Sequence, residues 1–207
     1  MWLVIVLVAC DRDHTVAFPD GLAPLDQENQ AAWPADGAEA VNTASGEADD
    51  YVWAHARGYI GAPLDAVYPC LRTTEVNLDR RQDAEWDRVD DVEEGYEHSY
   101  RLDVTVQSLV EVSFSDTWRH GSTRDEDDDS LLLVVTAWQM TEGNSYMTSK
   151  RGSIVTEPLD DETVSIDIVY QMDVALPDEE QMTTYLSDTH AELAACAAGE
   201  PLPTYDD

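Results

Sequence analysis

The sequence contains very little positive charge. Only 11 residues are Lys or Arg, against 44 Asp or Glu, so the formal net charge is -33, and Lys150 is the only lysine. A chain with this charge repels nucleic acid and anionic lipid head groups, and neither is an expected partner. The same charge favours cations, basic proteins and high solubility. We interpret most of it as a solvated acidic surface.

Common catalytic motifs are also absent. The sequence has no G-x-S-x-G, P-loop, G-x-G-x-x-G, C-x-x-C or H-E-x-x-H motif. Ser187, Asp188 and His190 share one predicted helix, whereas a catalytic triad needs groups that converge from different elements. The acidic run at 125–129 lacks the spacing of an EF-hand, so we expect a solvated loop there rather than a calcium site. The sequence therefore predicts no cofactor and no metal.

A hydrophobic run long enough to span a bilayer, about 20 residues, is missing too. Residues 1–9 are apolar and end at Cys10, after which the chain is polar. This length is typical of the apolar core of a secretory signal, although the usual basic start is lacking. A buried N-terminal strand is the alternative interpretation of such a short run.

The end of this run, Leu7-Val8-Ala9-Cys10, resembles the bacterial lipobox. The resemblance implies a lipoprotein signal peptide at 1–9 and acyl chains on Cys10. Two or three chains give lasting membrane attachment. We therefore expect an extracytoplasmic protein of the cell envelope that is lipid-anchored to a bacterial membrane.

The sequence holds three cysteines. If Cys10 is acylated, Cys70 and Cys196 remain as an even pair in an oxidising compartment. A bond between them would close a loop of over 100 residues and constrain the unfolded chain by about 4–5 kcal/mol. Geometry decides whether that disulfide forms, and the sequence leaves this open.

The chain is divided by composition. Residues 10–48 are rich in Ala, Asp, Glu, Pro and Gly without a sustained period, which is typical of an acidic flexible tether. A single domain is expected over 49–200, followed by an acidic tail at 201–207.

Within the domain, period-two alternation predicts strands over 51–60, 131–140, 146–156 and 163–174, and either two strands or one long bent strand over 96–119. Helical spacing predicts a short helix around 64–71, a second one near 79–88, and a long helix that opens at 177 and ends before Gly199. The unassigned stretch 86–98 has room for a further strand. This order indicates an α+β fold in which a curved antiparallel sheet grips the long C-terminal helix, because each element then buries its single apolar face.

The order of elements resembles that of the START-like (SRPBCC) or helix-grip superfamily, which includes polyketide cyclases and Bet v 1 allergens. The resembling segments are GYIGAPLDAVY at 58–68, GSIVTEP at 152–158, TVSI at 163–166 and the closing amphipathic helix. The resemblance covers residues 51–198, with five or six predicted strands where the family usually has seven.

Membership would imply a cavity between sheet and helix that holds a lipid or another hydrophobic small molecule. The candidate ligand-binding residues share inward-facing strand positions or the apolar stripe of the last helix. They are Phe114, Trp138, Met140, Ile168, Tyr170, Met172, Met182, Tyr185 and Leu186, within a wider inward set that adds Val104, Val106, Val112, Val134 and Ile166. The alternative for each of them is plain core packing.

Three functions follow as alternatives. The first is a membrane-anchored extracytoplasmic domain, without catalytic activity, that binds a hydrophobic small molecule or lipid. The second is a cyclase- or dehydratase-like enzyme of the same fold that uses His55, His98 or Tyr170 as acid or base. The third is a solid-cored structural lipoprotein of the envelope whose acidic face binds a basic partner.

Overall fold

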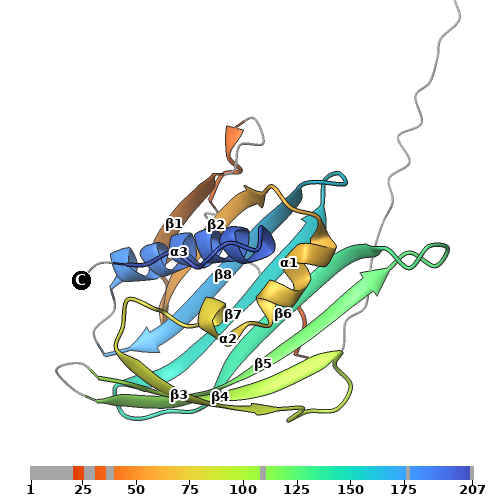
Figure 1. Cartoon of the computed structure of the whole chain (residues 1–207). Helices are drawn as coiled ribbons and strands as arrows, with labels where there is room; N and C mark the ends of the chain where they lie inside the picture. The colour runs from red at the N-terminus through yellow and green to blue at the C-terminus, as the bar shows by residue number, and fades with distance from the viewer. Residues whose placement is uncertain (1–20, 26–30, 36–39, 108–110, 176–177, 206–207) are drawn as a thin grey trace, which may run out of the picture.

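The computed structural model describes residues 21–25, 31–35, 40–107, 111–175 and 178–205. The predicted signal peptide and Cys10 lie outside these residues. Eight antiparallel strands form one sheet in the order β1-β2-β8-β7-β6-β5-β4-β3 (Figure 1). The strands are β1 Val41–Glu47, β2 Val52–Ile60, β3 Ala84–Asp90, β4 His98–Val106, β5 Val112–Arg124, β6 Leu131–Glu142, β7 Met147–Pro158 and β8 Val164–Val174. The helices are α1 Leu64–Leu71, α2 Thr74–Asn77 and α3 Glu179–Ala197.

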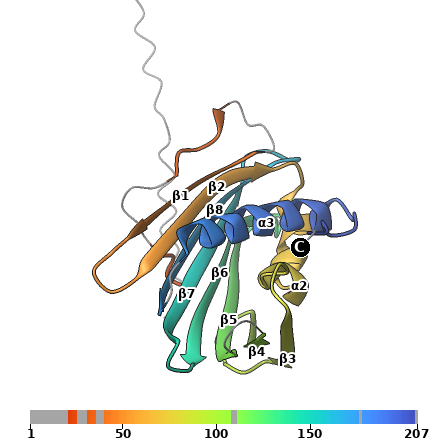
Figure 2. The same cartoon turned by 90° about the vertical axis from the view of Figure 1, so that its left-hand side faces the viewer.

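The sheet curves around the long helix. Figure 2 shows α3 lying across the concave side of the sheet, where it packs against β1, β2, α1 and α2. Even-numbered residues of the central strands face this side, and Trp118, Ile154 and Ile168 are 1% exposed there. The predicted α+β helix-grip architecture is thereby confirmed.

Two elements differ from the sequence prediction. The prediction of a helix near 79–88 is wrong, because Ala84–Asp90 forms strand β3 and the second helix is the short α2. β3 carries four charged residues in seven, so its apolar alternation is too weak to be recognised. Its Trp86 is 40% exposed, since an edge strand buries little surface.

The predicted boundary at residue 49 is also wrong. Val41–Glu47, inside the expected tether, forms β1 and pairs with β2 from Val41↔Gly58 to Glu47↔Val52. Its sequence, VNTASGE, has no apolar face because β1 is the other edge of the sheet. The folded domain therefore begins before residue 49.

The described parts of 21–35 pack on the convex side of the sheet. Leu22, 1% exposed, forms a small apolar cluster with Val135 and Ala137. The Leu25 amide donates to Ser153 Oγ at 2.9 Å, and the Ala31 amide donates to His55 Nδ1 at 2.9 Å. These contacts correct the expectation of a flexible tether for this part of the chain.

The C-terminal half of α3 is fixed from two sides. Cys196 forms a disulfide with Cys70 of α1, and their Cα atoms lie 5.9 Å apart. Beyond the helix, the Pro203 carbonyl accepts a hydrogen bond from Arg80 at 2.8 Å, and the Tyr205 ring lies 4.2 Å from the Arg81 guanidinium carbon. The described part of the predicted acidic tail is therefore docked on the domain.

Candidate functional site

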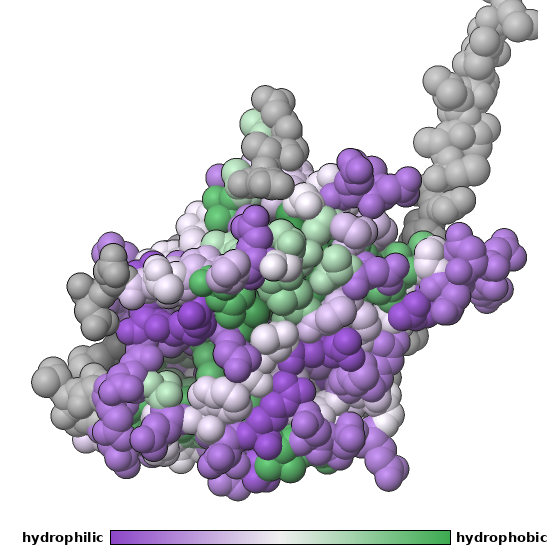
Figure 3. All heavy atoms as spheres, in the orientation of Figure 1, coloured by the Kyte–Doolittle hydropathy of each residue, from purple (hydrophilic) through white to green (hydrophobic). Residues whose placement is uncertain are grey.

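A pocket of about 290 Å³ lies under the N-terminal half of α3. Its walls come from the α2–β3 connection, from β4, β5, β7 and β8, and from α3 itself. In Figure 3, hydrophobic surface lies in the hollow between α3 and the strands below it. The lining residues are Asn77, Leu78, Asp79, Gln82, Ala84, Val104, Val106, Val112, Phe114, Tyr146, Met147, Lys150, Tyr170, Met172, Val174, Ala175, Asp178, Gln181, Met182 and Tyr185.

Five of the nine residues predicted to bind a ligand line this pocket. They are Phe114, Tyr170, Met172, Met182 and Tyr185, joined from the wider inward set by Val104, Val106 and Val112. Strand alternation predicted that Phe114, Tyr170 and Met172 face inward, and the apolar stripe of the last helix predicted the same for Met182 and Tyr185. The structure brings the two sets together around one pocket.

The other four predicted residues do not line the pocket. Trp138, Ile168 and Leu186 are buried in the main hydrophobic core, as are Val134 and Ile166 of the wider set. Met140 is half-buried on β6 and does not line the pocket. Alternation identifies the face on which a residue lies, but it does not say whether a helix packs directly on that part of the face.

Trp138 packs in the core next to the pocket wall. Its indole stacks on that of Trp118, with ring centroids 4.7 Å apart, and lies 6.0 Å from the ring of Tyr170. Gly152, opposite Trp138 on β7, leaves the space that this indole fills. Tyr170 in turn forms part of the pocket wall.

A buried ion pair stands at the pocket wall. Lys150 Nζ lies 2.5 Å from Asp116 Oδ2, and their side chains are 11% and 2% exposed. The ammonium group also lies 4.3 Å from the centroid of the Phe114 ring. Burial raises the pKa of Asp116, and the charge and hydrogen bond of Lys150 oppose that rise. Asp116 Oδ1 is buried without a hydrogen-bond partner among the described residues.

Two tyrosines line the pocket as neutral groups. Burial raises the pKa of Tyr170 and of Tyr185 well above the ordinary value. The Tyr185 hydroxyl donates to the Asn77 carbonyl at 3.0 Å, which fixes α3 to the end of α2. The ring centroids of the two tyrosines lie 5.5 Å apart. They therefore supply apolar surface and hold the helix in place.

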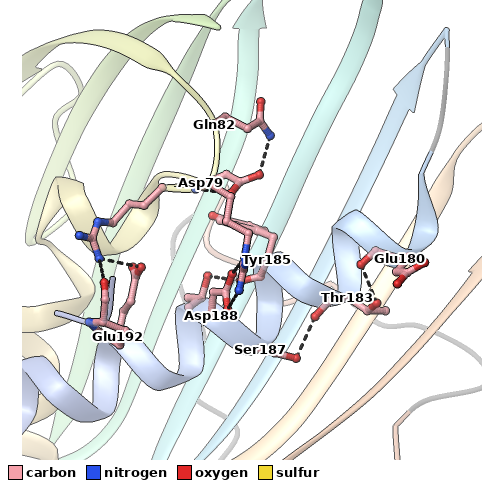
Figure 4. A network of polar contacts seen from close by, with 12 residues as sticks. Asp79, Gln82, Glu180, Thr183, Tyr185, Ser187, Asp188 and Glu192 are labelled. Atoms are coloured by element: carbon pink, nitrogen blue, oxygen red, sulfur yellow. Dashed lines mark hydrogen bonds and ion pairs between the residues drawn. The ribbon is translucent and has the colours of Figure 1, made fainter. Parts of the chain in front are cut away.

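The connection from α2 to β3 is clamped to α3 at the rim of the pocket. Figure 4 shows the Gln82 amide pointing to Asp79, with Tyr185 and Asp188 of α3 on the other side of Asp79. Arg81 Nη2 donates to Asp188 Oδ1 at 3.1 Å. Arg80 Nη1 donates to Glu192 Oε1 at 3.1 Å, although burial raises the pKa of that glutamate. Asp79 and Gln82 line the pocket, so this clamp positions one side of its mouth.

The three residues considered for acid–base catalysis do not converge. His55 lies on the convex side, where its Nε2 is 2.8 Å from Asp167 Oδ1. His98 lies beside Arg72, and burial and that guanidinium lower its pKa. Of these three residues only Tyr170 lines the pocket, and none of the described histidines does.

The described residues contain no group of three or more His, Cys, Asp or Glu side chains placed to hold a metal ion. In the loop at 125–130, Asp125 Oδ1 accepts a hydrogen bond from the Asp127 amide and Asp128 Oδ1 accepts one from the Ser130 amide. No described helix is long and apolar enough to cross a membrane.

Comparison with known proteins supports the fold. No protein-family model matches the sequence, and no curated protein matches it. Human StAR-related lipid transfer protein 5 superposes with a TM-score of 0.52 at 14% identity, over 77% of this chain and 82% of that one. Human STARD10 superposes with a TM-score of 0.50 at 9% identity, over 82% of this chain and 72% of that one. The chain thus has the helix-grip fold of START-like proteins.

Proposed function

We propose that this protein binds a hydrophobic small molecule or lipid in the pocket between the sheet and α3. The pocket itself carries the proposal. Its walls are mostly aliphatic, methionine and aromatic side chains, and a few polar groups stand among them. Its volume, about 290 Å³, lies at the lower end of the range of ligand pockets. A solid-cored domain would not leave this space.

Lys150 indicates that the ligand carries a polar group as well. It is the only cation among the lining residues, and its ammonium group has three N–H donors. Among the described residues, Asp116 is the only hydrogen-bond acceptor that Nζ reaches. A carbonyl, hydroxyl or carboxylate oxygen on the ligand would accept a second hydrogen bond from Nζ. An apolar body with one such group fits the pocket best.

The fold neighbours agree with this class of ligand. Human StAR-related lipid transfer protein 5 is a lipid transfer protein by name. A shared fold alone does not carry a function across, because function depends on the site. The apolar pocket of this chain supplies that second observation.

We further propose that the protein acts outside the cytoplasm, attached to a bacterial membrane through Cys10. The support is the sequence Leu7-Val8-Ala9-Cys10 at the end of an apolar run. The disulfide between Cys70 and Cys196 agrees with an oxidising compartment.

Ligand binding is tested with two matched tryptophan variants. Met172 and Met140 are both half-buried on strands, and only Met172 lines the pocket. Met172→Trp should fill the pocket and reduce uptake of a fluorescent fatty acid at least tenfold, and Met140→Trp should not. Native mass spectrometry of the purified wild type would detect a retained lipid. If neither method detects ligand, or if both variants bind equally, the proposed site is wrong.

Membrane attachment is tested separately in a bacterial host. Growth with an alkyne-labelled fatty acid should label the wild-type protein and leave Cys10→Ser unlabelled and free of the membrane fraction. Labelling that persists in Cys10→Ser would refute the anchor without affecting the ligand pocket.

A further inference from the structure

The edge strand β3 leaves part of its backbone unpaired. Just beyond each end of β3, one backbone hydrogen bond joins it to the β4 segment. The Asp91 amide donates to the Ser99 carbonyl at 2.7 Å, and the Gln107 amide donates to the Asp83 carbonyl at 2.9 Å. In antiparallel pairs, residues that bond to the neighbour alternate with residues that point away from it. Odd-numbered residues from 83 to 91 therefore face β4. Ala84, Trp86, Arg88 and Asp90 direct their N–H and C=O groups to the free edge.

Nothing in the described part of the chain covers this free edge. β4 is the main packing partner of β3, and no backbone hydrogen bond is made by the outward-facing groups of Ala84, Trp86 or Arg88. The opposite edge differs, since α3 packs on β1 and Asn42 Nδ2 donates to the Ala32 carbonyl. In Figure 1, β3 forms the lower border of the sheet.

The side chains of this edge are acidic on the convex side. Glu85 and Asp87 project there and line an open groove together with Asp103 and Glu142. The one cation in the groove, Arg101, is paired with Asp103. Four carboxylates against one guanidinium leave the groove with a net negative charge.

The same strand also exposes apolar surface. Trp86 is 40% exposed and Val89 is 45% exposed, so both remain available for contact. An unpaired edge with exposed apolar side chains is a template for strand addition. Peptides recognised in this way gain affinity from main-chain hydrogen bonds and specificity from alternate side chains.

We propose that the β3 edge binds an extended basic segment of another protein as an added strand. The N–H and C=O groups of Trp86 and Arg88 pair with its backbone. Lys or Arg at alternate positions of the segment face Glu85 and Asp87, and apolar residues between them contact Trp86. A second copy of this chain is a poor occupant, because its own β3 would bring Glu85 and Asp87 against like charges.

The test uses an acetylated, amidated eight-residue peptide of alternating Lys and Val with the full chain. Trp86→Thr and Trp86→Pro form a matched pair, since both lose the indole and only proline lacks the outward N–H. Proline is tolerated on an edge strand when its missing N–H faces solvent. The peptide should bind Trp86→Pro at least tenfold more weakly than Trp86→Thr. Binding should also protect the Trp86 and Arg88 amides of the wild type from hydrogen exchange.

A charge variant keeps the test decisive if the proline variant fails to fold. Glu85→Lys combined with Asp87→Lys should weaken peptide binding at least tenfold and reduce its dependence on salt. Equal affinity for the threonine and proline variants would overturn the proposal, as would peptide binding that ignores the charge reversal. Self-association through this edge without peptide binding would overturn it too. Uptake of the fluorescent fatty acid should stay unchanged in all of these variants.

Discussion

Gly152 offers the sharpest test of how the sheet is packed behind the pocket. A Cβ added at this residue would lie 1.9 Å from Cζ2, 2.3 Å from Cη2 and 2.4 Å from Cε2 of Trp138. No real Cβ approaches a heavy atom so closely, so Gly152→Ala must displace the indole. That indole is 3% exposed and stacked on Trp118.

The expected cost combines three contributions. Overpacking of a filled core costs about 1–3 kcal/mol, and loss of an aromatic stack costs about 0.5–1.5 kcal/mol. Alanine lowers the conformational entropy of the unfolded chain, which offsets about 0.4–1 kcal/mol of this cost. Gly152→Ala should therefore lower the free energy of unfolding by about 1–3.5 kcal/mol, although alanine usually favours an extended strand more than glycine does.

Urea denaturation followed by tryptophan fluorescence measures this loss, and near-ultraviolet circular dichroism reports the altered stack. A double-mutant cycle gives the control. Trp138→Leu removes the atoms that clash, so Gly152→Ala should cost little in that background. A Gly152→Ala protein as stable as wild type, or a cost that is the same with Leu at 138, would refute the reasoning.

Three further predictions concern other parts of the fold. Cys70→Ser should lower the free energy of unfolding by about 2–5 kcal/mol, because the disulfide closes a loop of 126 residues; denaturation of the wild type with and without reductant should show the same difference. Burial holds the pKa of His120 at about 3, against 6.5 when unfolded. Between these two pH values the unfolded state binds more protons than the folded state, so the free energy of unfolding decreases as the pH drops below 6.5. The total decrease is about 4–5 kcal/mol near pH 3. His120→Phe with Thr136→Val removes both partners of its hydrogen bond and should flatten the stability profile in that window, and an unchanged profile would exclude His120 as its source. Leu22→Ala should cost about 2–3 kcal/mol in urea denaturation, and a neutral result would show that the N-terminal segment does not contribute to stability.

The inner strands and the long helix were predictable because they carry strong patterns. Val164 to Val174 alternates over a whole strand, and the stripe through Met182, Leu186 and Leu193 faces the sheet. The edges were not predictable in this way. β1 and β3 each pair on one side only, so neither needs a continuous apolar face, and backbone pairing with β2 and β4 decides their conformation.

The pocket was only half predictable for a related reason. Trp138 and Phe114 both face inward, yet Trp138 is buried in the main core and Phe114 lines the pocket. The sequence does carry one signal for the ion pair at the pocket wall. Asp116 and Lys150 occupy inward positions among apolar neighbours, and charged residues at such positions indicate a buried pair or a binding group.

Because Lys150 is the only lysine in the sequence, it gives experimental access to the pocket. Its ε-amine is the only lysine amine in the chain and opens onto the pocket. A small amine-reactive reagent will therefore modify the N-terminus, where it is free, and this one internal site. The rate of acylation at Lys150, followed by peptide mass spectrometry, becomes a direct readout of occupancy, since a bound molecule shields the amine from the reagent.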